Sequence, residues 1–161
     1  MYLFDANVFI DANRRYYPLD IAPSFWTWLD EQCQMQRVAS ISSVYDELKR
    51  MEDSLTSWAQ RPQLQGAWLP PNAAAIENAT ELVEWAKNPE SSFQERAIEE
   101  FAASADLWLI AQAAAGQHTI VTHEQSSPNA KRKIFIPDAA VQLGVPCANP
   151  FDVFRQLGLH L

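Results

Sequence analysis

Short apolar runs recur along the chain, and their length and boundaries are those of buried β-strands. The first run, Met1-Tyr2-Leu3-Phe4, stops at an acidic residue. The strands expected from these runs span residues 2–5, 37–41, 117–122 and, more weakly, 145–148, with 67–69 as a short addition.

Stretches with helical spacing of apolar residues lie between these runs. The expected helices span residues 24–35, 42–59, 72–87 and 91–116, the last with a bend near Ala103-Ser104 and a stop at Gly116. Because strands and helices alternate, the pattern predicts an α/β fold with a mainly parallel sheet.

The same spacing predicts which side chains face the core. These are Phe25, Trp28 and Leu29, then Val44, Leu48, Met51, Leu55 and Trp58, and then Ile76, Leu82, Val83 and Trp85. The first helix should turn Asp30, Glu31 and Gln34 to solvent. Of the six tryptophans, Trp28, Trp58 and Trp108 are expected in the core, whereas Trp26, Trp68 and Trp85 are undecided.

Four acidic residues sit where an apolar strand or helix meets a turn, or at the border of an apolar stripe. Asp5 follows the first strand, and Glu124 follows the strand over 117–122. Asp106 begins the apolar turn Leu107–Ala111. Glu47 lies about 60° from Val44 around its helix and should be half-buried, whereas Asp46 and Asp53 point away. Together the four acids indicate a divalent-metal site, because carboxylate oxygens are ligands that Mg²⁺ and Mn²⁺ prefer.

Each acid taken alone has a structural alternative. Asp5 could be the N-cap of the next helix. Glu47 could be a side chain that reaches from the edge of a stripe to water. Asp106 could complement the positive end of a helix. The separation of these residues along the chain favours a shared site, since local helix pairing cannot explain it.

Composition bounds the class of protein. The chain has 161 residues, of which 48% are hydrophobic, and this suits a single domain over residues 1–161. The apolar run Leu107–Ala115 is too short to span a bilayer, and no signal sequence opens the chain, so we expect a cytoplasmic protein without a membrane partner. Two cysteines, Cys33 and Cys147, have no metal-binding spacing and are expected to be idle thiols.

The net charge of −8 excludes nucleic-acid binding through a broad basic surface. It does not exclude a metal-dependent nuclease, because bound divalent cations place positive charge where a phosphate must sit.

Four segments in order resemble the PIN domain, a metal-dependent ribonuclease fold found in many bacterial toxin–antitoxin systems. They are Leu3-Phe4-Asp5-Ala6-Asn7, Ser43-Val44-Tyr45-Asp46-Glu47-Leu48, Ala105-Asp106-Leu107-Trp108-Leu109-Ile110-Ala111 and Ile120-Val121-Thr122-His123-Glu124. Together with Ile136-Pro137-Asp138, they look like an uncharacterised PIN-like branch of prokaryotic proteins. The likeness covers essentially the whole chain.

The resemblance implies a three-layer α/β/α sandwich and a ribonuclease that uses Mg²⁺ or Mn²⁺. It implies that Asp5, Glu47 and Asp106 are the main metal ligands and catalytic residues, with Glu124 completing the site directly or through water. Most PIN domains carry Asp where this chain has Glu124. The implied partners are an RNA substrate and an antitoxin protein, and an exposed aromatic patch would mark a dimer or antitoxin surface.

Several further residues are candidates for supporting roles. Asn7 and Thr122 could hold carboxylates or touch the scissile phosphate, or could be ordinary turn and strand-end hydrogen-bonders. Lys131, Arg132 and Lys133, and also Arg14 and Arg15, could contact phosphates or be solvated. Asp138 is expected to cap a short helix over 139–143. His118, His123 and His160 lack the spacing of zinc ligands.

Two other functions fit part of the pattern. A phosphatase of the haloacid-dehalogenase type also places an Asp after its first strand, but it needs a second Asp where this chain has Asn7. A PIN-like binding module, weakened by Glu124 and acting through a protein partner, would need no catalysis. Metal binding separates the nuclease from the binding module.

Overall fold

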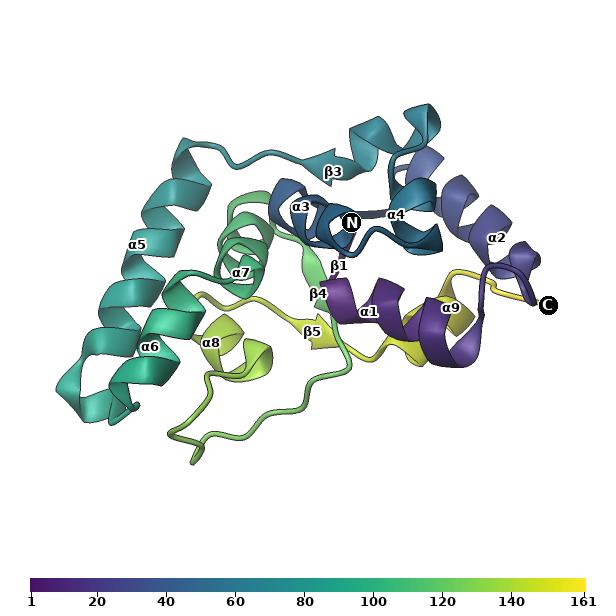
Figure 1. Ribbon diagram of the computed structural model, residues 1–161. Helices are drawn as coiled ribbons and strands as arrows, with labels where there is room; N and C mark the ends of the chain where they lie inside the picture. The colour runs from purple at the N-terminus through teal and green to yellow at the C-terminus, as the bar shows by residue number, and fades with distance from the viewer.

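The computed structural model describes residues 1–161. Five parallel strands form one sheet in the order β3-β2-β1-β4-β5 (Figure 1). They are β1 (Tyr2–Phe4), β2 (Val38–Ile41), β3 (Trp68–Leu69), β4 (Thr119–Val121) and β5 (Cys147–Ala148). Each falls within a predicted strand, so the predicted parallel α/β sheet is confirmed. The first strand is central, and its carboxyl end therefore lies in the middle of one edge of the sheet.

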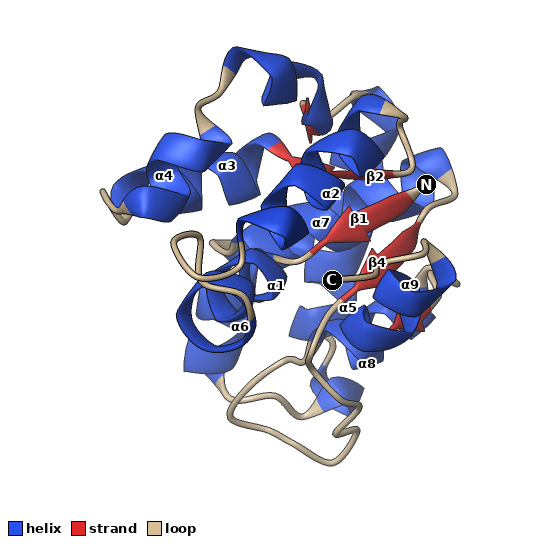
Figure 2. Ribbon diagram, turned by 90° about the vertical axis from the view of Figure 1, so that its right-hand side faces the viewer, coloured by secondary structure: helices blue, strands red, loops and turns tan.

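Helices cover both faces of the sheet. In Figure 2, α2 and α9 lie on the face turned to the viewer, and α5 and α7 lie behind the strands, which gives the expected three layers. The helical segments are α1 (Ala6–Asp11), the π-helix η1 (Ala12–Tyr16), α2 (Pro23–Gln34), α3 (Ser42–Arg50), α4 (Ser54–Ala59), the 3₁₀ helices η2 (Pro62–Ala67) and η3 (Pro89–Ser91), α5 (Ala73–Lys87), α6 (Glu95–Ala102), α7 (Ala105–Gly116), α8 (Ile136–Gln142) and α9 (Pro150–Gln156). None of the helices is both long and apolar enough to cross a membrane.

Aromatic side chains fill much of the core, and they correct the predicted placement of the tryptophans. Trp26, Trp58 and Trp68 are buried, and Trp58 packs against both of the others. Trp28 and Trp108 are only half-buried. On α5, Ile76 was predicted to face the core but is 53% exposed, and Val83 and Trp85 are only half-buried.

The helix predicted over residues 42–59 is broken in two. Glu52 has a φ of 50°, and Asp53 begins α4 with a capping box in which its carboxylate accepts a hydrogen bond from the Thr56 amide at 3.1 Å. The apolar stripe survives the break, because Leu48, Leu55 and Trp58 are still buried. The prediction of one continuous helix was wrong since local capping ended it.

The helix predicted over 91–116 is also two helices. Ser104 separates them, and its hydroxyl accepts a hydrogen bond from the Leu107 amide as the N-cap of α7. Gly116 is the last residue of α7, and the left-handed residue that follows is Gln117, with a φ of 55°. The predicted bend therefore lies at the right place, but it is a complete break.

Two acidic residues have partners that the pattern did not predict. Asp30 does not simply face solvent, since its carboxylate accepts hydrogen bonds from Trp58 Nε1 at 2.8 Å and Arg61 Nη1 at 3.1 Å. Asp138 is not the N-cap of a helix over 139–143, because α8 already begins at Ile136.

Cys33 is half-buried and Cys147 exposed, and both are free thiols.

Candidate active site

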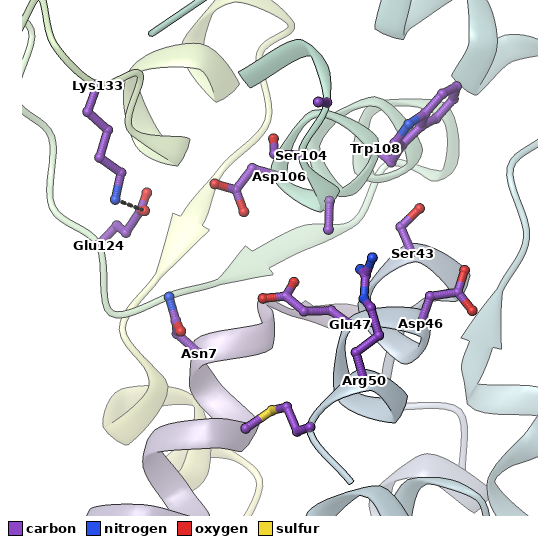
Figure 3. Close-up of a pocket in the computed structure, with 13 residues that line it drawn as sticks. Asn7, Ser43, Asp46, Glu47, Arg50, Ser104, Asp106, Trp108, Glu124 and Lys133 are labelled. Atoms are coloured by element: carbon purple, nitrogen blue, oxygen red, sulfur yellow. Dashed lines mark ion pairs between the residues drawn. The ribbon is translucent and has the colours of Figure 1, made fainter. Parts of the chain in front are cut away.

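An acidic pocket lies beyond the carboxyl ends of the central strands, where parallel α/β sheets bind ligands. It has a volume of about 660 Å³. Figure 3 shows the carboxylates of Glu47 and Asp106 pointing into the same space, with Asn7 below them and Glu124 on the opposite wall. The segments that carry these side chains are far apart in the sequence.

Asp5 is held at the end of β1, where the chain turns into α1, and its side chain is only 3% exposed. It stands at the N-cap position of α1, but its carboxylate accepts no hydrogen bond from that helix. Instead Oδ2 accepts a hydrogen bond from Thr122 Oγ1 at 3.0 Å. A capping role therefore does not explain this buried acid.

The surroundings of Asp5 disfavour its charged form. Burial, followed by the negative charge of Asp106, raises the pKa of Asp5 to about 7, although the Thr122 hydrogen bond opposes the shift. Glu124 and Glu47 raise it further. A buried carboxylate near three others lacks compensating positive charge.

Asp106 lies in the first turn of α7, which Ser104 caps. Burial raises its pKa to about 6, and the charge of Glu124 adds to the shift, while Lys133 opposes it. A position in the first turn of a helix by itself favours a charged carboxylate. The opposite shift shows that burial and neighbouring acids outweigh the effect of the helix end.

Glu47 is half-buried on α3, as its helical position predicted, and Asp46 beside it is exposed. Burial raises the pKa of Glu47, and the nearby Arg50 opposes this. Arg50 and Asp46 both line the pocket (Figure 3).

Glu124 differs from the other three acids because both of its carboxylate oxygens have partners. Oε1 lies 3.0 Å from Lys133 Nζ, and Oε2 accepts a hydrogen bond from the Ile136 amide at 2.7 Å. Its own amide donates to Thr122 Oγ1 at 3.1 Å. Thr122 thus links Glu124 to Asp5.

The structure brings some of the other candidates to the pocket and not the rest. Asn7 and Lys133 line it, whereas Lys131, Arg132, Arg14 and Arg15 do not. Asp138 lies outside it as well, and it accepts hydrogen bonds from Ser126 and Ser127. The His123 ring packs between Tyr16 and Phe151.

Sequence reasoning missed eight of the residues that line the pocket. They are Ser43, Asp46, Arg50, Met51, Ala103, Ser104, Ala105 and Trp108. Ser104 carried a signal, because Ser-x-x-apolar spacing before an apolar run is typical of an N-cap. Arg50 follows Glu47 by three positions, so it shares a helix face with that acid.

The donor chemistry suits a divalent cation. In this conformation, no group of three His, Cys, Asp or Glu side chains is close enough together to coordinate one metal ion. Mg²⁺, however, usually keeps several of its waters and takes only one or two carboxylates directly. The raised pKa values of Asp5 and Asp106 mark a place where a cation would relieve the repulsion between carboxylates.

Comparison with known proteins identifies the family. A family model described as a domain of unknown function (DUF4411) matches residues 2–161. The chain belongs to the DUF4411 family. No curated protein matches the sequence of this DUF4411 protein.

Two solved structures are similar in fold to this DUF4411 protein. The crystal structure of FitAcB from Neisseria gonorrhoeae aligns with a TM-score of 0.54 and 19% identity, covering 94% of this chain and 99% of that chain. A structure of FitAB bound to an IR36 DNA fragment aligns with a TM-score of 0.57 and 18% identity, covering 100% of this chain and 99% of that chain. The expected PIN-like fold is confirmed.

Proposed function

We propose that this DUF4411 protein is a metal-dependent endoribonuclease that hydrolyses RNA phosphodiester bonds in the acidic pocket. The observation that carries the proposal is the gathering of carboxylates at one edge of the sheet. Glu47 of α3 and Asp106 of α7 line the pocket, and the charges of both raise the pKa of the buried Asp5 at the end of β1. After burial, the charge of Asp106 is the largest cause that raises the pKa of Asp5, and the charge of Glu124 is the largest that raises the pKa of Asp106. Burying several carboxylates near one another is unfavourable unless a cation compensates their charge, so this arrangement favours a cation-binding site.

Asp5, Glu47 and Asp106 would hold Mg²⁺ or Mn²⁺. Such an ion makes an attacking water more acidic and stabilises the charge on the leaving oxygen. Hydrolysis joins the oxygen of water to phosphorus and breaks the bond from phosphorus to the leaving nucleoside oxygen, which gains a proton.

The chain's own residues position these carboxylates. Thr122 donates a hydrogen bond to Asp5 and fixes its orientation, as outer hydrogen bonds commonly do for ligating carboxylates. Asn7, on the first turn of α1, presents an amide to the pocket that can hydrogen-bond a phosphate oxygen. Arg50 adds a cation beside Glu47.

The same proposal includes a biological role as the toxin of a prokaryotic toxin–antitoxin pair. The PIN-like fold supports this role, because the PIN domain that the sequence resembles is found in many bacterial toxin–antitoxin systems. An antitoxin protein is then the expected partner. RNA rather than DNA as substrate follows from the same resemblance.

Calorimetric titration with Mn²⁺ tests the metal site first. The wild type should bind Mn²⁺, and the Asp5→Asn/Asp106→Asn variant should not. The exposed residues Asp20 and Asp152 provide a matched control, because the Asp20→Asn/Asp152→Asn variant has the same net charge and an intact pocket. Cleavage of labelled single-stranded RNA by the same three proteins should follow metal binding.

The outcomes separate the candidate functions. Metal binding with metal-dependent RNA cleavage supports the nuclease. Absence of Mn²⁺ binding by the wild type would contradict it and favour a binding module that acts through a protein partner. A phosphate group trapped on Asp5 would instead indicate the phosphatase.

A further inference from the structure

Lys133 and Glu124 form an ion pair on the wall of the acidic pocket (Figure 3). The side chain of Glu124 is 12% exposed, whereas that of Lys133 is 54% exposed. The ammonium group therefore sits against a nearly buried carboxylate and remains open to the pocket. Its charge reaches Asp106, whose pKa it lowers against the effect of Glu124.

Hydrogen bonds on either side of Lys133 in the sequence anchor the segment that carries it. Asp138 accepts a hydrogen bond from the Ser127 amide at 2.8 Å, which ties down one end of the segment between β4 and α8. At the other end, the Ile136 amide donates to Glu124. Lys133 Nζ also lies 4.8 Å from the centre of the Phe135 ring. The ammonium itself is held by the ion pair with Glu124 and lies beside the Phe135 ring.

Lys131 has a different environment, although it is only two residues away. Its ammonium donates to the Ser91 carbonyl at 3.0 Å, and its own carbonyl accepts from the Gln94 amide at 2.9 Å. It lies against the segment that precedes α6 and does not line the acidic pocket. The basic run is therefore divided, and only Lys133 faces the pocket.

We propose that Lys133 binds a non-bridging oxygen of the scissile phosphodiester, and that Glu124 is the positioning residue that holds the Lys133 ammonium there. This inference rests on the proposed nuclease function. An ammonium has three donors, so the bond to Glu124 leaves others free for phosphate, which lysine binds as a point charge. Glu124, with both oxygens engaged by the chain itself, is then not a direct metal ligand.

The division of roles explains the departure from Asp at this position. The longer side chain of Glu124 reaches both the Ile136 amide and the Lys133 ammonium. A lysine added to an acidic pocket also offsets part of the repulsion that an RNA phosphate meets in a protein with a net charge of −8.

The salt dependence of RNA affinity tests the phosphate contact. Labelled single-stranded RNA is titrated at several salt concentrations in the inactive Asp5→Asn background. Lys133→Met should reduce the slope of log affinity against log salt by about 0.7, the value of one phosphate contact on a single strand. Lys131→Met is the matched control and should keep the original slope, and Lys133→Arg should restore it.

Cleavage rates and metal affinity test the role of Glu124. With Asp5 present, Lys133→Met should slow single-turnover cleavage by about 10²-fold, as the loss of one charge-stabilising donor does. Glu124→Gln should slow it to a similar extent and keep Mn²⁺ affinity, and the Glu124→Gln/Lys133→Met double variant should be no slower than Lys133→Met alone.

Two results would overturn the inference and leave the nuclease intact. One is loss of Mn²⁺ binding in Glu124→Gln, which would make Glu124 a ligand. The other is a wild-type salt slope and cleavage rate in Lys133→Met. If the wild type itself neither binds Mn²⁺ nor cleaves RNA, the proposed function fails and this inference falls with it.

Discussion

Asp5 is a carboxyl group that the fold buries beside other acids, and this has a consequence for stability. Its pKa is 3.8 in an exposed side chain and about 7 in the folded protein. The folded state therefore binds a proton more tightly than the unfolded chain does. The stabilisation is fully present below pH 3.8 and is lost as the pH rises to about 7. Above neutral pH, where Asp5 is charged, its burial lowers the free energy of unfolding of the metal-free protein by up to about 4 kcal/mol.

Asp5→Asn should therefore stabilise the metal-free protein at high pH, because asparagine resembles the protonated acid. In urea unfolding with a chelator, the wild type should be less stable at pH 8 than at pH 5. The Asp5→Asn variant should lose much less stability over the same range and be more stable than the wild type at pH 8. Asp152→Asn, an exposed control, should keep the wild-type profile. Parallel profiles for wild type and Asp5→Asn would show that Asp5 is already charged in the fold.

Thr122 lowers the pKa of Asp5 by donating a hydrogen bond to it. Thr122→Val keeps the shape of the side chain and removes the donor. We expect Mn²⁺ affinity at pH 7 to fall by about 10-fold, the lower end of losses for such supporting contacts. Because the proton competes less at higher pH, the loss should shrink at pH 8.5. Thr119→Val, at the other end of β4, should bind Mn²⁺ like the wild type, and an equal loss in both variants would contradict the specific role of Thr122.

At the scale of elements, the break between α3 and α4 gives a stability test. Asp53→Ala removes the capping box that begins α4, and such losses cost about 1 kcal/mol. Urea unfolding should show a decrease of that size. Asp152→Ala should change stability much less, because Asp152 is exposed and pairs only with Arg155 on the surface. An unchanged midpoint for Asp53→Ala would mean that packing alone sets the break.

The strands were predictable because each is a short, mainly apolar run that ends at a charged or polar residue or, for β3, at Pro70. The break at Glu52 was not, since Leu48, Leu55 and Trp58 keep helical spacing across it and a positive φ leaves no mark in an apolar pattern. The Asp53-x-x-Thr56 spacing is a capping signal, but the continuous apolar stripe on both sides of it favoured a single helix.

The acids of the pocket were predictable for a similar reason. Asp5 directly follows β1 and Glu124 comes three residues after the end of β4, and the carboxyl ends of these two strands meet at one edge. The pairing of Glu124 with Lys133 was not predictable, because the path of the segment between β4 and α8 decides it. Which of the three neighbouring basic residues faces the pocket depends on the contact of Lys131 with Ser91, 40 residues away, and on the contact of Ser127 with Asp138, neither of which leaves a mark in the local pattern.

For the whole molecule, the proposed metal site would link metal binding to folding. An ion that binds only the folded state, at a concentration 100 times its Kd, raises the free energy of unfolding by about 2.7 kcal/mol. Thermal unfolding of the wild type should therefore shift upward with Mn²⁺. The Asp5→Asn/Asp106→Asn variant should not shift, and the Asp20→Asn/Asp152→Asn control should behave like the wild type. An equal shift in all three proteins would indicate binding elsewhere.

The central position of β1 also orders the events of synthesis. Asp5 leaves the ribosome before Thr122, its hydrogen-bond partner, which is 117 residues further along the chain. At 5–20 residues per second, roughly 6–23 s separate the two. During that interval β1 lacks its neighbour β4. Asp106 leaves the ribosome only late in the interval, and Lys133 leaves it after Thr122. A nascent chain therefore cannot assemble the pocket until both Thr122 and Lys133 have left the ribosome.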